Sequence, residues 1–233
     1  MKRLKTAIKG FDELIEGGFV KDTVNLITGP AGSGKSLFGM QFIYNGVRLF
    51  EETGIYITLE EGSENVRNTM INHDMDIDKF INEGKLYIID LGEVEKDTAK
   101  SARRIRGFES LAEFLSNLIK ISHAKRVVVD NLSAIGINYE TSGDLRQGLF
   151  RFGRFLKDNN VTALLITEML NEEQKTRFGV EEFISDSFIQ LLMREEKGQL
   201  NRYILIRKIR FSAHDDKIHQ YQLTREGIKI IRK

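Results

Sequence analysis

The sequence predicts an α/β fold in which a mostly parallel sheet is covered by helices on both faces and continues into an antiparallel extension. Between about residues 23 and 167, short apolar segments alternate with amphipathic segments of helical period. Such alternation is typical of a parallel sheet in a three-layer α/β/α sandwich. From residue 188 onward, apolar segments follow one another across short polar turns, which indicates antiparallel strands.

The elements of the first half follow from local patterns. A short helix is expected around residues 10–18, ending at a glycine pair. Apolar runs too short for helices predict strands at residues 23–28, 55–59 and 86–90. Apolar residues at helical spacing predict a helix over residues 37–47, and a polar helix is expected from about residue 63. Residues 93–106 have no apolar period, so a mobile loop is expected there.

The second half continues the alternation and then changes. An apolar face at helical spacing predicts a helix over residues 108–122, and a second such pattern covers residues 144–157. Strands are expected at residues 126–130 and 161–167, and the antiparallel extension at residues 188–193, 202–210 and 218–223. Neither a linker nor an internal repeat interrupts this order. The sequence therefore predicts a single domain over residues 1–233.

The composition limits the class of protein. The chain of 233 residues is 41% hydrophobic and 30% charged, as in globular proteins. Its net charge of +1 argues against attachment to nucleic acid through bulk charge, and the absence of cysteine excludes disulfides and thiolate metal sites. No run of residues resembles a signal peptide or approaches the roughly 18 apolar residues of a membrane span. We expect a cytoplasmic protein without membrane contact.

The most specific motif is G-x-x-x-x-G-K-S, between the first predicted parallel strand and the helix that follows it. Its residues are Gly29, Pro30, Ala31, Gly32, Ser33, Gly34, Lys35 and Ser36. Glycines let the backbone bend around a polyphosphate and point N–H groups at it, while the helix presents its positive N-terminal end to the same anion. Lys35 is expected to contact the β- and γ-phosphates and the Ser36 hydroxyl to bind Mg²⁺. The motif predicts a nucleoside-triphosphate site.

Carboxylates follow two other predicted strands. Glu60 and Glu61 come directly after residues 55–59, and Asp130 ends residues 126–130. Ligands of open α/β sheets bind outside the carboxyl ends of the strands. Glu60 and Glu61 either orient the water that attacks the γ-phosphate or only stabilise the start of the next helix. Asp130 either holds the shell of the Mg²⁺ ion or only forms a turn with Asn131.

Two cations mark the predicted strand over residues 202–210. Lys208 and Arg210 are two residues apart, so their side chains project from the same face, and His214 follows just beyond. One interpretation is an anion site at a γ-phosphate, where a cation is often supplied by a neighbouring subunit. The other is a solvated edge strand, on which lysine prevents aggregation.

Together these motifs resemble the KaiC family of RecA-like P-loop ATPases, over nearly the whole chain. Residues 6–18 are similar to the opening signature G-x-x-x-L-D-x-L-x-x-G-G of that family, with Phe11 in place of a leucine. Residues 178–186 resemble its G-V-E-E-F-[VI]-[SA]-D stretch, and residues 208–214 keep its spacing K-x-R-x-x-x-H. In this comparison the Glu60–Glu61 pair corresponds to the catalytic glutamates and Asp130 to the Walker B aspartate.

The resemblance implies a RecA-like fold and slow, Mg²⁺-dependent ATP hydrolysis at subunit interfaces of a homohexamer or other ring. It implies that Lys208 and Arg210 reach the ATP of the adjacent subunit, with His214 among the nucleotide-binding residues. For the biological role, we expect a regulatory switch that docks an unidentified signalling partner. The alternative is a DNA-binding accessory ATPase in recombination or repair, because other RecA-like proteins are recombinases and helicases.

The chain departs from the family in three respects. The clock protein of the family carries two such domains, whereas this chain carries one. Where its second domain has tandem Ser-Thr phosphate acceptors, this chain has Glu182 and Phe183, so we expect no autokinase activity. Phe211 replaces a glycine that often follows the arginine.

Basic residues outside the motifs bear on the DNA alternative. The best local candidate is the basic loop over residues 100–106, which lacks the aromatic stacking platform of many single-strand binders. Other basic residues expected near RecA-type loops are Arg146, Arg151, Lys175 and Arg177. These cations either contact DNA phosphates or are solvated or subunit contacts.

Overall fold

The computed structural model describes residues 1–97, 105–171 and 173–231. Residues 100–104 of the predicted basic loop lie outside these ranges. In chain order the elements are β1 Arg3–Leu4, the 3-10 helix η1 Asp12–Ile15, β2 Phe19–Val20, β3 Val24–Gly29, α1 Lys35–Phe50, β4 Gly54–Thr58, α2 Ser63–Asn72, α3 Asp78–Asn82, β5 Leu86–Asp90, α4 Leu91–Asp97, α5 Phe108–Ser122, β6 Arg126–Asp130, α6 Ser133–Gly136, α7 Ser142–Asp158, β7 Thr162–Glu168, α8 Glu181–Ile184, β8 Ser187–Glu196, β9 Gln199–Ile209, β10 His219–Thr224 and β11 Gly227–Ile231.

The main sheet has nine strands within the described residues, in the order β11-β10-β9-β8-β3-β7-β6-β4-β5. The strands from β8 to β5 in this order are mutually parallel, and β9, β10 and β11 are antiparallel to their neighbours. The predicted α/β class and the antiparallel extension are confirmed, except that β8 is parallel to β3. The chain crosses back to the start of β3 before β8 begins, where the Asp186 N–H donates to the Val24 carbonyl at 2.7 Å.

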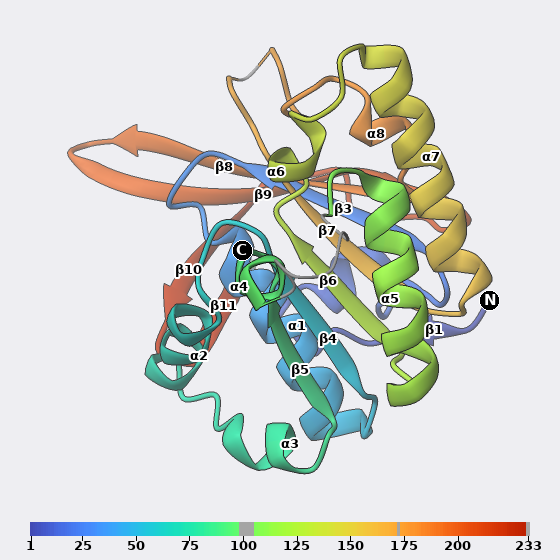
Figure 1. The fold of residues 1–233 in the computed structure, drawn as a ribbon. Helices are drawn as coiled ribbons and strands as arrows, with labels where there is room; N and C mark the ends of the chain where they lie inside the picture. The colour runs from blue at the N-terminus through green and yellow to red at the C-terminus, as the bar shows by residue number, and fades with distance from the viewer. Residues whose placement is uncertain (98–104, 172, 232–233) are drawn as a thin grey trace.

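Helices cover both faces of the sheet (Figure 1). On one face α5 and α7 pack side by side, and on the other α1 packs with α2 and the N-terminal segment. Adjacent residues of β3 divide between the two layers, since Leu26 belongs to the core under α5 and α7 and Ile27 to the core under α1. This alternation explains why the parallel strands are apolar throughout: both of their faces are buried.

One predicted loop is a helix in part. Residues 93–97 belong to α4, which begins directly after β5. The Asp90 carboxylate accepts hydrogen bonds from the N–H groups of Gly92 at 2.7 Å and Glu93 at 3.3 Å. A side chain that satisfies the free N–H groups of a first turn favours a helix without any apolar period. The loop prediction was wrong for these residues.

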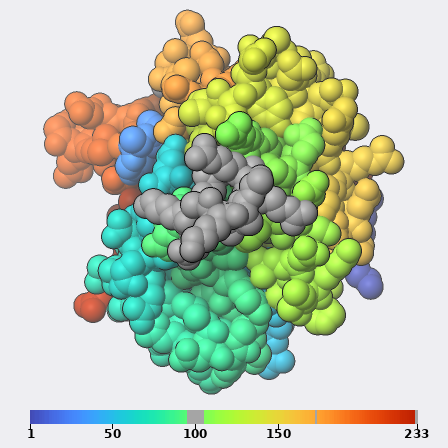
Figure 2. Space-filling model, in the orientation of Figure 1, coloured from blue at the N-terminus to red at the C-terminus, as the bar shows by residue number. Residues whose placement is uncertain are grey.

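The β8–β9 hairpin projects from the body of the molecule (Figures 1 and 2). Its strands extend to Glu196 and Gln199, well past the carboxyl end of β3. None of the helices in the described ranges combines the length and apolarity needed to cross a membrane.

Candidate active site

The carboxyl ends of four parallel strands bring the predicted site together. The phosphate loop follows β3, Glu60 follows β4, Asp130 ends β6, and β7 ends at Glu168. A backbone hydrogen bond joins two of these segments: the Leu59 N–H, after β4, donates to the Asp130 carbonyl, at the end of β6, at 2.8 Å. Four groups that are distant in sequence therefore share one edge of the sheet, where α/β proteins bind ligands.

The phosphate loop presents unpaired N–H groups. Gly32 and Gly34 have φ angles of 78° and 89°, which favour glycine. Gly34 is the N-cap of α1 and offers no side chain to the helix, and the first intrahelical bond runs from the Phe38 N–H to the Gly34 carbonyl at 2.9 Å. Among the described residues, the N–H groups from Gly34 to Leu37 have no acceptor, and the first turn of α1 contains no acidic residue. This donor set fits a polyphosphate.

Lys35 is the cation of this loop. Its Nζ donates to the Pro30 carbonyl at 3.1 Å. Burial lowers the pKa of Lys35, while the negative charges of Asp130, Glu168 and Glu60 raise it. A half-buried ammonium that interacts with the charge of three carboxylates and, within the described ranges, donates to a carbonyl alone is a suitable partner for phosphate oxygens.

Asp130 and Ser36 supply oxygen ligands for a metal ion. Burial raises the pKa of Asp130, and hydrogen bonds from Ser36 and Tyr56, together with the charge of Lys35, lower it. The Tyr56 hydroxyl donates to Asp130 Oδ2 at 2.6 Å. Burial raises the pKa of Tyr56 well above its ordinary value, so the phenol stays protonated and remains a donor. A hydroxyl beside a carboxylate fits Mg²⁺, which is usually held by one or two protein oxygens together with phosphates.

The two adjacent glutamates have different surroundings. Glu60 Oε2 accepts a hydrogen bond from Asn131 Nδ2 at 2.8 Å. Burial, then the charges of Glu168 and Asp130, raise the pKa of Glu60, and Lys35 lowers it. The pKa of Glu61 is raised by burial and by Asp130 alone. Lys35 thus acts on the pKa of Glu60, whereas the shift of Glu61 comes from burial and Asp130.

Lys208 and Arg210 lie away from this edge. Their side chains share a face, as predicted, but Lys208 is level with Phe188, near the amino end of β8. Lys208 Nζ donates to the Glu182 carbonyl at 2.6 Å, and Arg210 Nη2 lies 3.4 Å from the Phe183 carbonyl. These contacts place both cations on the α7–α8 side of the sheet, whereas α1 lies on the other side. Neither cation faces the phosphate loop of its own chain.

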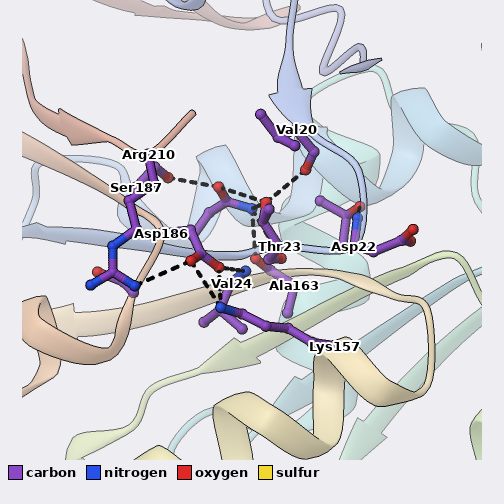
Figure 3. A network of polar contacts seen from close by, with 12 residues as sticks. Val20, Asp22, Thr23, Val24, Lys157, Ala163, Asp186, Ser187 and Arg210 are labelled. Carbon is purple, nitrogen blue, oxygen red and sulfur yellow. Dashed lines mark hydrogen bonds and ion pairs between the residues drawn. The ribbon is translucent and has the colours of Figure 1, made fainter. Parts of the chain in front are cut away.

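A buried aspartate, Asp186, lies beside Arg210 and pairs with two cations (Figure 3). The Asp186 side chain is 4% exposed and pairs with Lys157 at 2.7 Å and with Arg210 at 3.5 Å. Its Oδ2 also accepts the Val24 N–H at 3.0 Å. His214 is half-buried in the loop between β9 and β10. The N–H of its neighbour Asp215 bonds to the Leu14 carbonyl at 2.9 Å.

Sequence reasoning missed four residues of the site. Glu168 could have been predicted from the sequence, because it follows an apolar strand as directly as Asp130 does. Tyr56 and Asn131 act through partners on other strands or loops. Arg202, on β9, donates through Nε to the Gly32 carbonyl at 3.2 Å, across 170 positions of sequence. A contact between residues so distant in sequence cannot be predicted from a local sequence pattern.

Comparisons with known proteins find similar sequences and a similar fold. A family model described as KaiC ATPase matches residues 4–233. A circadian clock oscillator protein KaiC from Parathermosynechococcus lividus is 34% identical over 97% of this chain, which spans 42% of that protein. A UPF0273 protein from Thermotoga maritima is 33% identical over 99% of this chain and 96% of its own length. The crystal structure of a KaiC-like protein from Pyrococcus horikoshii is 34% identical, with a TM-score of 0.86 over 99% of both chains.

Proposed function

Because the chain belongs to the KaiC ATPase family, we propose that it binds and hydrolyses ATP with Mg²⁺ at residues 29–36, in a site that a second copy of the chain completes. The observation that carries the proposal is the row of N–H groups at the start of α1 that have no acceptor in the described part of the chain, with Lys35 beside them and the charge of Asp130 acting on Lys35. A donor set of this kind binds a triphosphate through its charge and shape.

Each residue has a separate task in this proposal. The loop N–H groups and Lys35 bind the β- and γ-phosphates, and the Ser36 hydroxyl and Asp130 hold the metal and its water shell. When bound, Mg²⁺ neutralises the charge on the phosphates. Tyr56 fixes the Asp130 carboxylate through its 2.6 Å hydrogen bond.

We assign the water-orienting role to Glu60 rather than Glu61. Asn131 holds the Glu60 carboxylate at 2.8 Å, and Lys35 acts on its charge. A carboxylate that is held beside the phosphate lysine can orient a water in line with the γ-phosphate and accept its proton. Glu61, on this proposal, does not take part in catalysis.

Lys208, Arg210 and His214 act on the nucleotide of a neighbouring copy. In support, both cations lie away from the phosphate loop of their own chain and contact residues 182–186. A cation placed at the γ-phosphate stabilises the charge of the transition state. Contacts of this kind between identical chains are head-to-tail. They form a closed ring when the rotation from each copy to the next brings the last copy back to the first.

As to the biological role, we propose a nucleotide-state switch in the cytoplasm that docks a protein partner. The DNA-binding alternative stays a prediction from the sequence. Among the described basic residues, Arg151 pairs with Glu109 at 3.5 Å and Arg146 lies over the Phe183 ring at 5.5 Å. Neither contact favours DNA.

Replacing the loop lysine tests the nucleotide site. Lys35→Ala is expected to abolish detectable Mg·ATP binding in a calorimetric titration, because the phosphates lose their only cation within the loop. Lys79→Ala is the matched control, since Lys79 is 70% exposed and its ion pair with Glu83 spans 3.9 Å. Wild-type affinity in Lys35→Ala would refute the assignment.

A further inference from the structure

The antiparallel extension contacts the phosphate loop. One of these contacts comes from β10 and holds the backbone of the loop. The Tyr221 hydroxyl, from β10, donates a hydrogen bond to the Ser33 carbonyl, 188 positions away in sequence. Tyr221 is 2% exposed and Ser33 is fully buried. Burial raises the pKa of Tyr221, so the phenol remains a donor at any physiological pH.

This hydrogen bond fixes the direction of one peptide group. In a planar trans peptide, the carbonyl and the following N–H point in opposite directions. The carbonyl of Ser33 points at Tyr221, so the N–H of Gly34 points away from β10. Among the described residues that N–H has no acceptor. A free N–H that points away from β10 is available as a donor to an anion at the start of α1.

A second residue of β10 supports the same peptide. A Cβ atom added to Gly34 would lie 2.8 Å from Cδ2 of Leu223, which is two positions beyond Tyr221 on the same face of the strand. The Ser33 carbonyl is thus held by a hydrogen bond from Tyr221, and Leu223 of the same strand leaves no room for a side chain at Gly34.

We infer that Tyr221 is a positioning residue for nucleotide binding, which aims the Gly34 N–H at the phosphates by holding the Ser33 carbonyl. The inference rests on the proposed function of residues 29–36. It extends the nucleotide site to a strand that carries no phosphate-binding motif. Tyr221 acts through the loop and does not touch the nucleotide itself.

The test compares three conservative variants of the full chain. Tyr221→Phe removes only the hydroxyl and should raise both the Kd and the KM for Mg·ATP about three- to tenfold, the effect of one lost hydrogen bond. Its kcat should stay within about twofold of wild type, because an N–H bound equally to ground state and transition state changes KM alone.

Two controls separate positioning from a general loss of stability. Tyr203→Phe removes a hydroxyl that bonds to Glu196 at 2.7 Å on the projecting hairpin. Ile230→Val truncates the residue directly opposite Tyr221 on β11. Both should keep the wild-type KM, even where the unfolding midpoint of Ile230→Val falls.

A Tyr221→Phe protein with wild-type Kd and KM would overturn the inference, as would a fall in kcat with KM unchanged, since that is the result of fewer folded molecules. Failure of the proposed function has a different signature: the wild-type protein itself would then have no affinity for Mg·ATP.

Discussion

At the residue scale, the site is a balance of charges around Lys35. Asp130, Glu168 and Glu60 all raise the pKa of this lysine, against the effect of burial. Burial raises the pKa of Glu60, and the charges of Glu168 and Asp130 raise it further because nearby anions disfavour its ionised form, while Lys35 lowers it. Because these charges act on one another, the groups should titrate together. Removing one charge should therefore shift the pKa values of the others.

Glu168 offers a direct test of this coupling. Its charge raises the pKa of both Glu60 and Lys35, so Glu168→Gln lowers both. Glu60 then stays ionised, and able to act as a base, at lower pH, while Lys35 loses its proton at lower pH. Both limbs of the profile of kcat/KM against pH should therefore move to lower pH.

Glu140→Gln is the control for this profile, because Glu140 is exposed and lies in the turn before α7. It should leave both limbs in place. An unmoved acidic limb in Glu168→Gln would contradict the assignment of Glu60 as the base.

Residues of the site could be predicted where the local sequence carries the chemistry. The glycines, Lys35 and Ser36 form a contiguous motif, and Asp130 ends an apolar strand, so the structure brings them to one edge as expected. Tyr221 and Arg202 could not be predicted, because their partners lie 188 and 170 positions away. Contacts of that kind depend on the order of strands in the sheet, which periodicity does not reveal.

At the element scale, the amino end of β6 is held by a buried cation. Arg126 is fully buried, donates twice to Glu52 Oε2 at 2.9 and 2.7 Å, and also donates to the carbonyls of Phe42 and Lys5 at 2.9 and 2.8 Å. Its guanidinium lies 4.8 Å from the centre of the Phe42 ring. One side chain thus ties β6, the C-terminal half of α1 and the N-terminal segment together.

We expect Arg126→Ala to reduce the free energy of unfolding by about 3–5 kcal/mol, since it breaks the buried ion pair with Glu52 and removes the donor to two backbone carbonyls. Urea unfolding measures the loss. Lys125→Ala, one position earlier and exposed, should cost less than about 0.5 kcal/mol. A loss in Arg126→Ala no larger than in this control would show that the buried ion pair does not stabilise the fold.

Helices and strands with a strong apolar period could be predicted from the sequence. Features that depend on a single side-chain contact or on the path of the chain could not. The predicted strand over residues 126–130 and helix over residues 108–122 coincide with β6 and α5. The helix α4 was missed because the Asp90 carboxylate, rather than an apolar face, starts it. The parallel pairing of β8 was missed because it depends on the long crossover that precedes the strand.

At the scale of the whole molecule, the acidic edge with the phosphate loop and the cationic region on the α7–α8 side are separate surfaces of one chain. Lys208 and Arg210 rest on the carbonyls of Glu182 and Phe183, and the carboxylate of Asp186 holds Arg210 in place. A head-to-tail contact would bring the cations of one copy to the nucleotide of the next. The central claim is therefore that one site is built from two chains.

Complementation between two inactive variants tests that claim most directly. On the proposed function, Lys35→Ala lacks the cation that binds the phosphates and Arg210→Ala lacks the cation that reaches the nucleotide of the neighbour, so each protein alone should be almost inactive. Mixed assemblies contain interfaces in which an intact loop meets an intact Arg210, about a quarter of the total if mixing is random. Arg207, on the opposite face of β9, bonds to Gln190 at 2.7 Å, so Arg207→Ala should be active alone. The account predicts that ATPase activity returns on mixing; mixed assemblies that stay inactive would contradict it.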